Sequence, residues 1–217
     1  MGLWKPENYG RQFYGLSTLR LGIEKSRNLM TVRLAQQIGM RPVVSYARKF
    51  NIVDHMPPVL SMALGAGETT LMRLTTAYAM LVNGGKQVSP TLIDRIQNRY
   101  GETIYRYDER PCVGCNAIWT GQEKPILPDV RERVLSPQTS YQIVSMLEGV
   151  VKRGTGRSIR SVGKPLAGKT GTTNDSRDAW FVGFSPDLAV GVYIGFDSPR
   201  TLGEGQTGGR KPAPVNT

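Results

Sequence analysis

The spacing of apolar residues predicts helices in the first three quarters of the chain. After a Ser17-Thr18 N-cap, one helical signal runs to Gly39. A shorter helix is expected from Val43 to Phe50. The apolar positions of the first signal recur at steps of three and four, with one serine among them, and would form one face: Leu19, Ile23, Ser26, Met30, Leu34 and Ile38.

Two further helices have stronger boundaries. One carries an apolar stripe and stops near Gly84. The other begins at Ser136-Pro137, where a serine N-cap is followed by proline at the first helical position, and runs to Gly154. The stripes are Leu71, Leu74, Tyr78 and Leu81 in the first and Tyr141, Val144, Leu147 and Val151 in the second.

Strand patterns follow in two places. Residues 92–96 and 103–107 flank a turn-rich 97–101 and predict a β-hairpin. In the last third, 165–172, 178–185 and 188–197 read as three successive short strands, which favours an antiparallel meander. Residues 108–134 hold several prolines and are expected to be an irregular excursion. The fold class is therefore α+β, with helices packed on an antiparallel sheet.

The composition limits which partners, metal sites and redox centres the chain can have. The 217 residues are 39% hydrophobic and 21% charged, which is typical of a globular chain, and the net charge of +11 suits an anionic neighbour. The one histidine, His55, lies in a proline-rich loop without ligand partners at metal spacing. Cys112 and Cys115 predict a local disulfide or an idle pair rather than a metal or redox centre. No cofactor is expected.

Lys169 belongs to two competing motifs. Gly163–Thr170 matches the phosphate-loop pattern G-x4-G-K-[ST], which would make the chain a nucleotide-binding protein. Such a loop must open a helix, but 171–175 consists of poor helix formers and is followed by a strand. The other interpretation is Lys169-Thr170-Gly171 on an edge strand, where lysine supplies charge and glycine lets a substrate backbone approach.

The K-T-G motif gains weight from Ser26-Arg27-Asn28, because S-x-N and K-T-G occur together in one class of active site. With these motifs the chain resembles the C-terminal part of the transpeptidase domain of class A penicillin-binding proteins. Four blocks carry the resemblance, in family order: TLRLGIEKSRNLMTVRLAQQIG, ALGAGETTLMRLTTAYAMLVNGG, GVVKRGTGR and LAGKTGTTNDSRDAWFVGFSP. It implies the penicillin-binding and β-lactamase-like fold and a serine D,D-transpeptidase that cross-links peptidoglycan stem peptides and is acylated by β-lactams.

The resemblance also implies a role for individual residues. Ser26 would relay protons with Lys169, and Asn28 would hold the acyl side chain of the donor peptide. Thr170 and Thr172 would bind the terminal carboxylate, and Gly171 would allow an antiparallel β-contact. Residues i and i+2 of a helix lie about 200° apart, so Ser26 and Asn28 can share a cleft only if the helix breaks between 26 and 28.

The family's nucleophile belongs to an S-x-x-K motif upstream of S-x-N, and this chain has no such motif there. Its one S-x-x-K string, Ser161–Lys164, lies in a Gly/Pro loop that offers no helix N-terminus, so we interpret it as coincidence. Residues 1–217 are accordingly expected to form a partial transpeptidase domain, incomplete at both ends and inactive alone. The membrane anchor and glycosyltransferase of the family would lie upstream, outside this chain.

The resemblance places the protein on the periplasmic side of the bacterial inner membrane. Its expected partners are stem peptides, β-lactams and an anionic cell-wall polymer or membrane surface. Nucleic acid is not expected, because no strand interleaves basic and aromatic residues. Besides nucleotide binding, the alternative is a non-catalytic basic remnant that acts through surface contacts.

Overall fold

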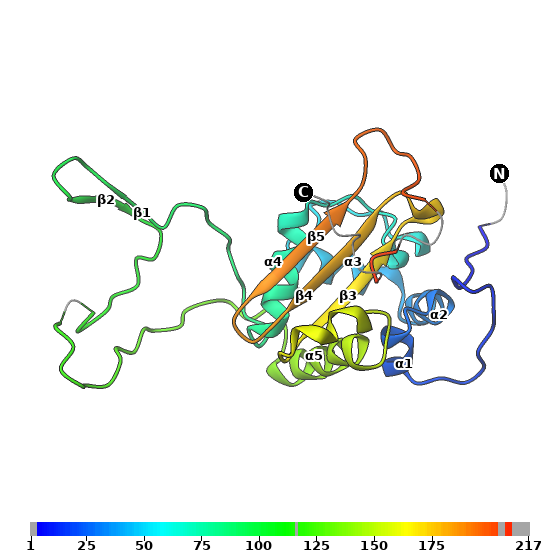
Figure 1. The fold of residues 1–217 in the computed structure, drawn as a ribbon, viewed down its shortest axis with the longest axis horizontal. Coiled ribbons are helices and arrows are strands. Elements are labelled where there is room, and N and C mark those ends of the chain that lie inside the picture. Colours follow the sequence, from blue (N-terminus) through cyan, green and yellow to red (C-terminus); the bar gives the residue numbers. More distant parts are fainter. Residues whose placement is uncertain (1–3, 116, 204–206, 210–217) are drawn as a thin grey trace. The chain divides into compact units, whose positions relative to one another are not determined.

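The computed structural model describes residues 4–115, 117–203 and 207–209. The chain divides into two compact units, one made of 1–88 with 133–217 and the other of 89–132. The first unit contains five α-helices and the larger sheet in its described part (Figure 1). Its elements are α1 (Leu19–Glu24), α2 (Asn28–Ile38), α3 (Met40–Lys49), α4 (Leu71–Val82), α5 (Pro137–Lys152), β3 (Ala167–Thr172), β4 (Ala179–Phe184) and β5 (Ala189–Ile194), with short 3₁₀ helices at Leu60–Leu64, Arg157–Val162 and Asn174–Ser176.

The first helical signal is two helices, as the S-x-N argument required. The Thr18 side chain accepts from the Leu21 amide and caps α1, which ends at Glu24 before α2 begins at Asn28. The single apolar stripe predicted through both segments is wrong at both ends, because Leu19 and Ile38 are more than half exposed and Val32 and Ala35 are buried instead. A stripe counted across a break loses its phase, since the second helix restarts with its own rotation.

The other helices begin close to their predicted starts. Helix α3 starts at Met40 rather than Val43, because proline within the first helical turn needs no hydrogen-bonded N–H. The Ser136 side chain accepts from the Thr139 amide and caps α5, as its sequence predicted. Of the α5 stripe, Leu147 and Val151 are buried, whereas Tyr141 is exposed.

Strands β3, β4 and β5 form the predicted antiparallel meander in that spatial order. Ala167 pairs with Phe184, which pairs with Ala189, so these three residues form one row across the sheet. Helices α4 and α5 pack on this row, and α5 also contacts α1 (Figure 1). The α+β class with helices on an antiparallel sheet is therefore confirmed.

Two apolar clusters stabilise the first unit. One joins Leu147 and Val150 of α5 to the Ala167–Phe184 row, with Ile23 of α1 packed at its edge. The other joins Ala77 and Met80 of α4 to Phe50. Burial of such side chains contributes about 1.5–3 kcal/mol each. The first cluster therefore fixes α1, α5 and β3 against one another, and these are the elements that carry the candidate site.

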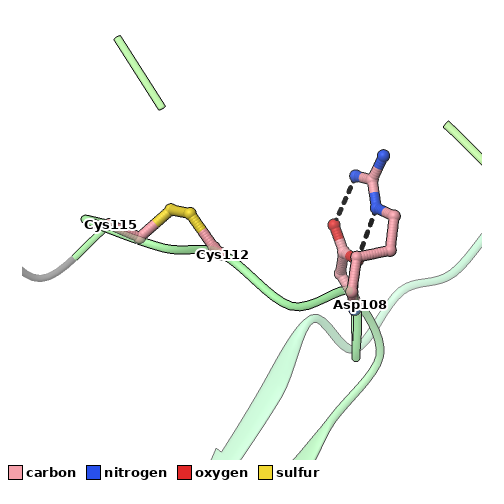
Figure 2. The surroundings of a disulfide bond; sticks show 4 residues. Asp108, Cys112 and Cys115 are labelled. Carbon is pink, nitrogen blue, oxygen red and sulfur yellow. Dashed lines mark hydrogen bonds and ion pairs between the residues drawn. A yellow bond between two sulfur atoms is a disulfide. The ribbon is translucent and has the colours of Figure 1, made fainter. Parts of the chain in front are cut away.

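The second unit contains the predicted hairpin, with β1 (Arg95–Gln97) antiparallel to β2 (Thr103–Arg106). Cys112 and Cys115 form a disulfide with their Cα atoms 5.6 Å apart, near the Asp108–Arg110 ion pair (Figure 2). Of the two alternatives for the cysteines, the local disulfide is the one observed. Both hairpin strands are exposed along their whole length, which explains why the separate unit begins at Ser89, well before the predicted excursion at 108.

Among the described residues, no helix is both long and apolar enough to cross a membrane.

Candidate functional site

The structure brings Ser26 and Lys169 together across 143 residues of sequence. The Lys169 ammonium donates to the Ser26 hydroxyl, with Nζ and Oγ 2.7 Å apart. The same nitrogen also donates to the Thr170 carbonyl oxygen at 2.8 Å. The S-x-N turn and the K-T-G strand thus meet at their polar side chains.

The position of Lys169 on β3 explains its environment. Side chains alternate across a strand, so Lys169 lies on the same face as Ala167. That face packs against α5. Burial disfavours the charged form and lowers the pKa of Lys169 to about 8. A lysine with this pKa can exchange a proton near neutral pH, as an ordinary surface lysine cannot.

Ser26 adopts a left-handed backbone conformation with φ of 52°. A non-glycine residue in this region is strained and must be held by its surroundings. Two backbone bonds brace the turn: the Ser26 amide donates to the Ile23 carbonyl at 3.2 Å, and the Arg27 amide donates to the Gly22 carbonyl at 2.8 Å. This conformation ends α1 and re-aims the chain into α2.

Thr170 and Thr172 lie on the opposite face of β3 from Lys169, because of the same alternation. Thr170 shares a hydrogen bond with the Thr155 hydroxyl at 2.7 Å, and the Thr172 hydroxyl accepts from the Gly208 amide at 3.3 Å. Gly171 lies between them and pairs with Trp180 of β4. In the part of the chain that the structure describes, β3 has a strand on only one side, so its other edge can accept a peptide by strand addition.

Asn28, the first residue of α2, does not contact Ser26 or Lys169 through any described hydrogen bond. Its side-chain amide donates to the Glu7 carbonyl at 2.9 Å, which ties the N-terminal segment to the start of α2. The structure therefore brings two of the three predicted catalytic residues into contact, whereas the side chain of the third bonds the N-terminal segment.

Neither the phosphate-loop string Gly163–Thr170 nor the S-x-x-K string Ser161–Lys164 has the helix that its motif requires. Lys169 and Thr170 lie inside β3, which continues to Thr172, so the Gly163–Thr170 string opens no helix. A phosphate loop needs that helix N-terminus, and the nucleotide-binding alternative is wrong on this point. Ser161 lies near the end of the 3₁₀ helix Arg157–Val162, which closes at Gly163 in a left-handed conformation. The S-x-x-K string thus lacks the helix N-terminus that a nucleophile needs.

Three residues around the site were not singled out from the sequence. Glu24 at the end of α1 is 2% exposed and is paired with Arg153, which follows α5. Thr155 links Glu24 to Thr170, since its amide donates to the Glu24 carbonyl at 3.1 Å and its hydroxyl bonds Thr170. Arg153 and Thr155 lie in the GVVKRGTGR block, which carried the resemblance but had no assigned role.

No group of three or more metal-ligating side chains occurs among the residues that the structure covers. His55 is exposed in an irregular segment, and the two cysteines are bonded to each other. The site therefore offers a buried amine, hydroxyls and a strand edge, which suits proton transfer and carboxylate or peptide binding.

Comparisons with known proteins agree with this arrangement. The family model described as the penicillin binding protein transpeptidase domain matches residues 2–215. Penicillin-binding protein 1A from Rickettsia typhi is 46% identical over 99% of this chain, which spans 28% of that protein's length.

Solved structures show the same similarity. The crystal structure of penicillin-binding protein 1A from Haemophilus influenzae superposes with a TM-score of 0.82 at 30% identity, over 96% of this chain and 34% of that one. PonA1 from Mycobacterium tuberculosis in complex with penicillin V has a TM-score of 0.73 at 19% identity, over 94% of this chain and 55% of that one, which indicates the same fold.

Proposed function

Because the chain belongs to the penicillin-binding protein transpeptidase domain family, we propose that it supplies the S-x-N and K-T-G parts of a serine D,D-transpeptidase. The observation that carries this proposal is the 2.7 Å bond between Lys169 Nζ and Ser26 Oγ. The reaction would join peptidoglycan stem peptides through a serine acyl-enzyme. In the family the attacking serine belongs to an S-x-x-K motif, and no serine other than Ser26 bonds Lys169 among the described residues.

In this proposal Ser26 and Lys169 move protons rather than attack the substrate. The lowered pKa of Lys169 lets a fraction of the amine be neutral at physiological pH, so it can accept a proton through the Ser26 hydroxyl. The protonated amine then returns that proton toward the leaving group. The 2.7 Å distance is within the reach that such a transfer requires.

The substrate carboxylate would be held by the hydroxyls of Thr170 and Thr172, on the face of β3 opposite Lys169, and the charge of Lys169 would favour an anion near the strand. The free edge of β3 would pair with the substrate backbone, and Gly171 adds no side chain there. Asn28 would hold the acyl side chain once its amide leaves the Glu7 carbonyl. The same donors fit the carboxylate of a β-lactam, in line with the penicillin V complex of the similar PonA1.

The cellular setting follows from the same proposal. Peptidoglycan cross-linking occurs outside the bacterial inner membrane, so we place this domain on the periplasmic side. A basic surface also supports contact with an anionic wall polymer or membrane surface, since Arg41, Arg48 and Lys49 of α3 line a hollow of about 420 Å³.

Binding of benzylpenicillin to the chain tests the proposal. In an NMR titration the β3 amide signals should shift on addition of the drug. Thr172→Val and Lys169→Met should each weaken binding about tenfold, since the first removes a donor to the carboxylate and the second removes a nearby positive charge. Ser161→Ala is the control and should bind as the unaltered chain does. Equal binding by all four proteins would contradict the proposed site.

A further inference from the structure

The buried carboxylate of Glu24 lies two residues before Ser26, at the junction of α1 and α5. Its side chain is 3% exposed and has two cationic partners. Arg153 holds it with both guanidinium contacts, Nε to Oε2 at 2.8 Å and a second, shorter one to Oε1, and Arg20 of α1 lies 3.9 Å away, Nη1 to Oε1. Arg153 itself is half exposed. A buried carboxylate needs such pairing, and helix packing of α1 on α5 could have been achieved by an apolar residue at lower cost. The position therefore calls for a role beyond packing.

Backbone contacts join the same two segments. The Thr155 amide donates to the Glu24 carbonyl at 3.1 Å, and Lys25 Nζ donates to the Arg153 carbonyl at 2.8 Å. The turn after α5 and the turn that carries Ser26 thus each donate one hydrogen bond to the other. Since Ser26 holds a strained left-handed conformation, these bonds supply the surroundings that maintain it.

The third segment of the ring is β3. The Thr155 and Thr170 hydroxyls are 2.7 Å apart, and the neighbouring Lys169 bonds Ser26. Starting at Ser26, the contacts run through the Glu24 backbone carbonyl to Thr155, then to β3, and return through Lys169, while the Glu24 carboxylate holds Arg153, whose own carbonyl accepts from Lys25. This closed ring of contacts fixes the distance between Ser26 Oγ and Lys169 Nζ through residues other than these two.

Two glycines show how closely the segments approach. A Cβ on Gly149 of α5 would collide with the Glu24 carboxylate, and a Cβ on Gly154 would collide with the Glu24 carbonyl oxygen. An added side chain at Gly149 must therefore displace the Glu24 carboxylate, and one at Gly154 must shift backbone atoms of Glu24 and Val150.

We propose that Glu24, held by Arg153 beside Gly149, is a positioning residue that keeps the Ser26 hydroxyl on Lys169 Nζ. The catalytic relevance of this positioning rests on the proposed function, but the experiment that tests the positioning needs no substrate. When Ser26 moves away, water reaches the ammonium and the desolvation that lowers the pKa of Lys169 is relieved.

The test follows the pKa of Lys169 by NMR of its ε-methylene group, assigned with Lys169→Arg, in folded protein. In Glu24→Gln the pKa should rise by about one pH unit from its lowered value. The direction is diagnostic, because loss of a negative charge without movement of Ser26 would lower the pKa. Glu148→Gln is the matched control: it makes the same substitution in the exposed Glu148–Lys152 pair of α5 and should leave the pKa unchanged.

Gly149→Ala provides a second perturbation without any change of charge. Alanine favours the helix, so α5 persists while the added Cβ displaces the Glu24 carboxylate. The pKa of Lys169 should rise here as well. An unchanged or lowered pKa in either folded variant would overturn the proposal. Failure of both variants to fold would also overturn it, because Glu24 would then serve general packing. Neither result depends on whether penicillin binds the chain.

Discussion

Replacing Lys169 by methionine should change how the stability of the protein depends on pH. Lys169 has a pKa of about 8 in the folded protein and an ordinary value of 10.5. Between these two values the unfolded chain holds one proton more than the folded chain at this residue. The free energy of unfolding therefore rises with pH through this window, and it falls as pH drops toward the folded pKa.

The magnitude follows from the two pKa values. Between pH 7 and pH 10 the titration of Lys169 should add about 2.5 kcal/mol to the free energy of unfolding. Lys169→Met lacks this contribution, so its stability should change less over the same range. Burial raises the pKa of Tyr78 to about 12, and its titration also affects stability at high pH, but equally in both proteins. The difference between the two proteins isolates Lys169.

Urea unfolding followed by circular dichroism at pH 7, 8, 9 and 10 measures the effect. At pH 7 the variant should be at least as stable as the unaltered chain, because burying the charged ammonium costs free energy that methionine does not incur. By pH 10 the unaltered chain should have gained about 2.5 kcal/mol on the variant. Parallel stability curves would show that Lys169 is not desolvated, and the argument from burial would be refuted.

Two smaller predictions concern stability elsewhere. Ser140 is 1% exposed and donates to the Leu81 carbonyl, so Ser140→Ala should lower the free energy of unfolding by about 1–3 kcal/mol in urea titrations, and an unchanged midpoint would contradict this. Replacing Cys112 and Cys115 by serine should change the free energy of unfolding of the unit 1–88 with 133–217 by less than about 0.5 kcal/mol, since the disulfide lies in the other unit. Stoichiometric zinc in the reduced protein, measured by atomic absorption, would overturn the assignment of these cysteines as a structural pair.

Local signals were sufficient for most of the fold. The proline and serine at the start of α5 and the turn residues of the hairpin act within a few positions, so they could be read directly. The break at Ser26 came from a geometric requirement, since two residues two apart on a helix cannot share a cleft. The residues that pack α2 could not be predicted in the same way, because the burial of Val32 and Ala35 depends on how α1, α3 and the 3₁₀ helix Leu60–Leu64 pack around this helix.

The candidate site shows the same division. The motifs predicted that Ser26 and Lys169 belong together, and the structure confirms their contact. Glu24 was missed because an acid near a helix end usually lies in solvent. Besides the local partner Arg20, its burial depends on Arg153 and Gly149, which lie far along the chain. The pKa of Lys169 likewise depends on packing that no local pattern reveals. No sequence signal tied Asn28 to Glu7.

Covalent labelling by a fluorescent penicillin distinguishes an attacking serine from one that transfers protons. We expect no adduct on residues 1–217 alone, measured by intact-mass spectrometry, because Ser26 transfers protons and does not attack. Joined to the segment that precedes the matching region in the Rickettsia typhi relative, the chain should be labelled on a serine of that segment. Lys169→Ala should slow the labelling at least about a hundredfold, and Ser161→Ala should not. An adduct on Ser26 or Ser161 of the chain alone, or equal labelling of the two variants, would show that the roles proposed for Ser26 and Lys169 are wrong.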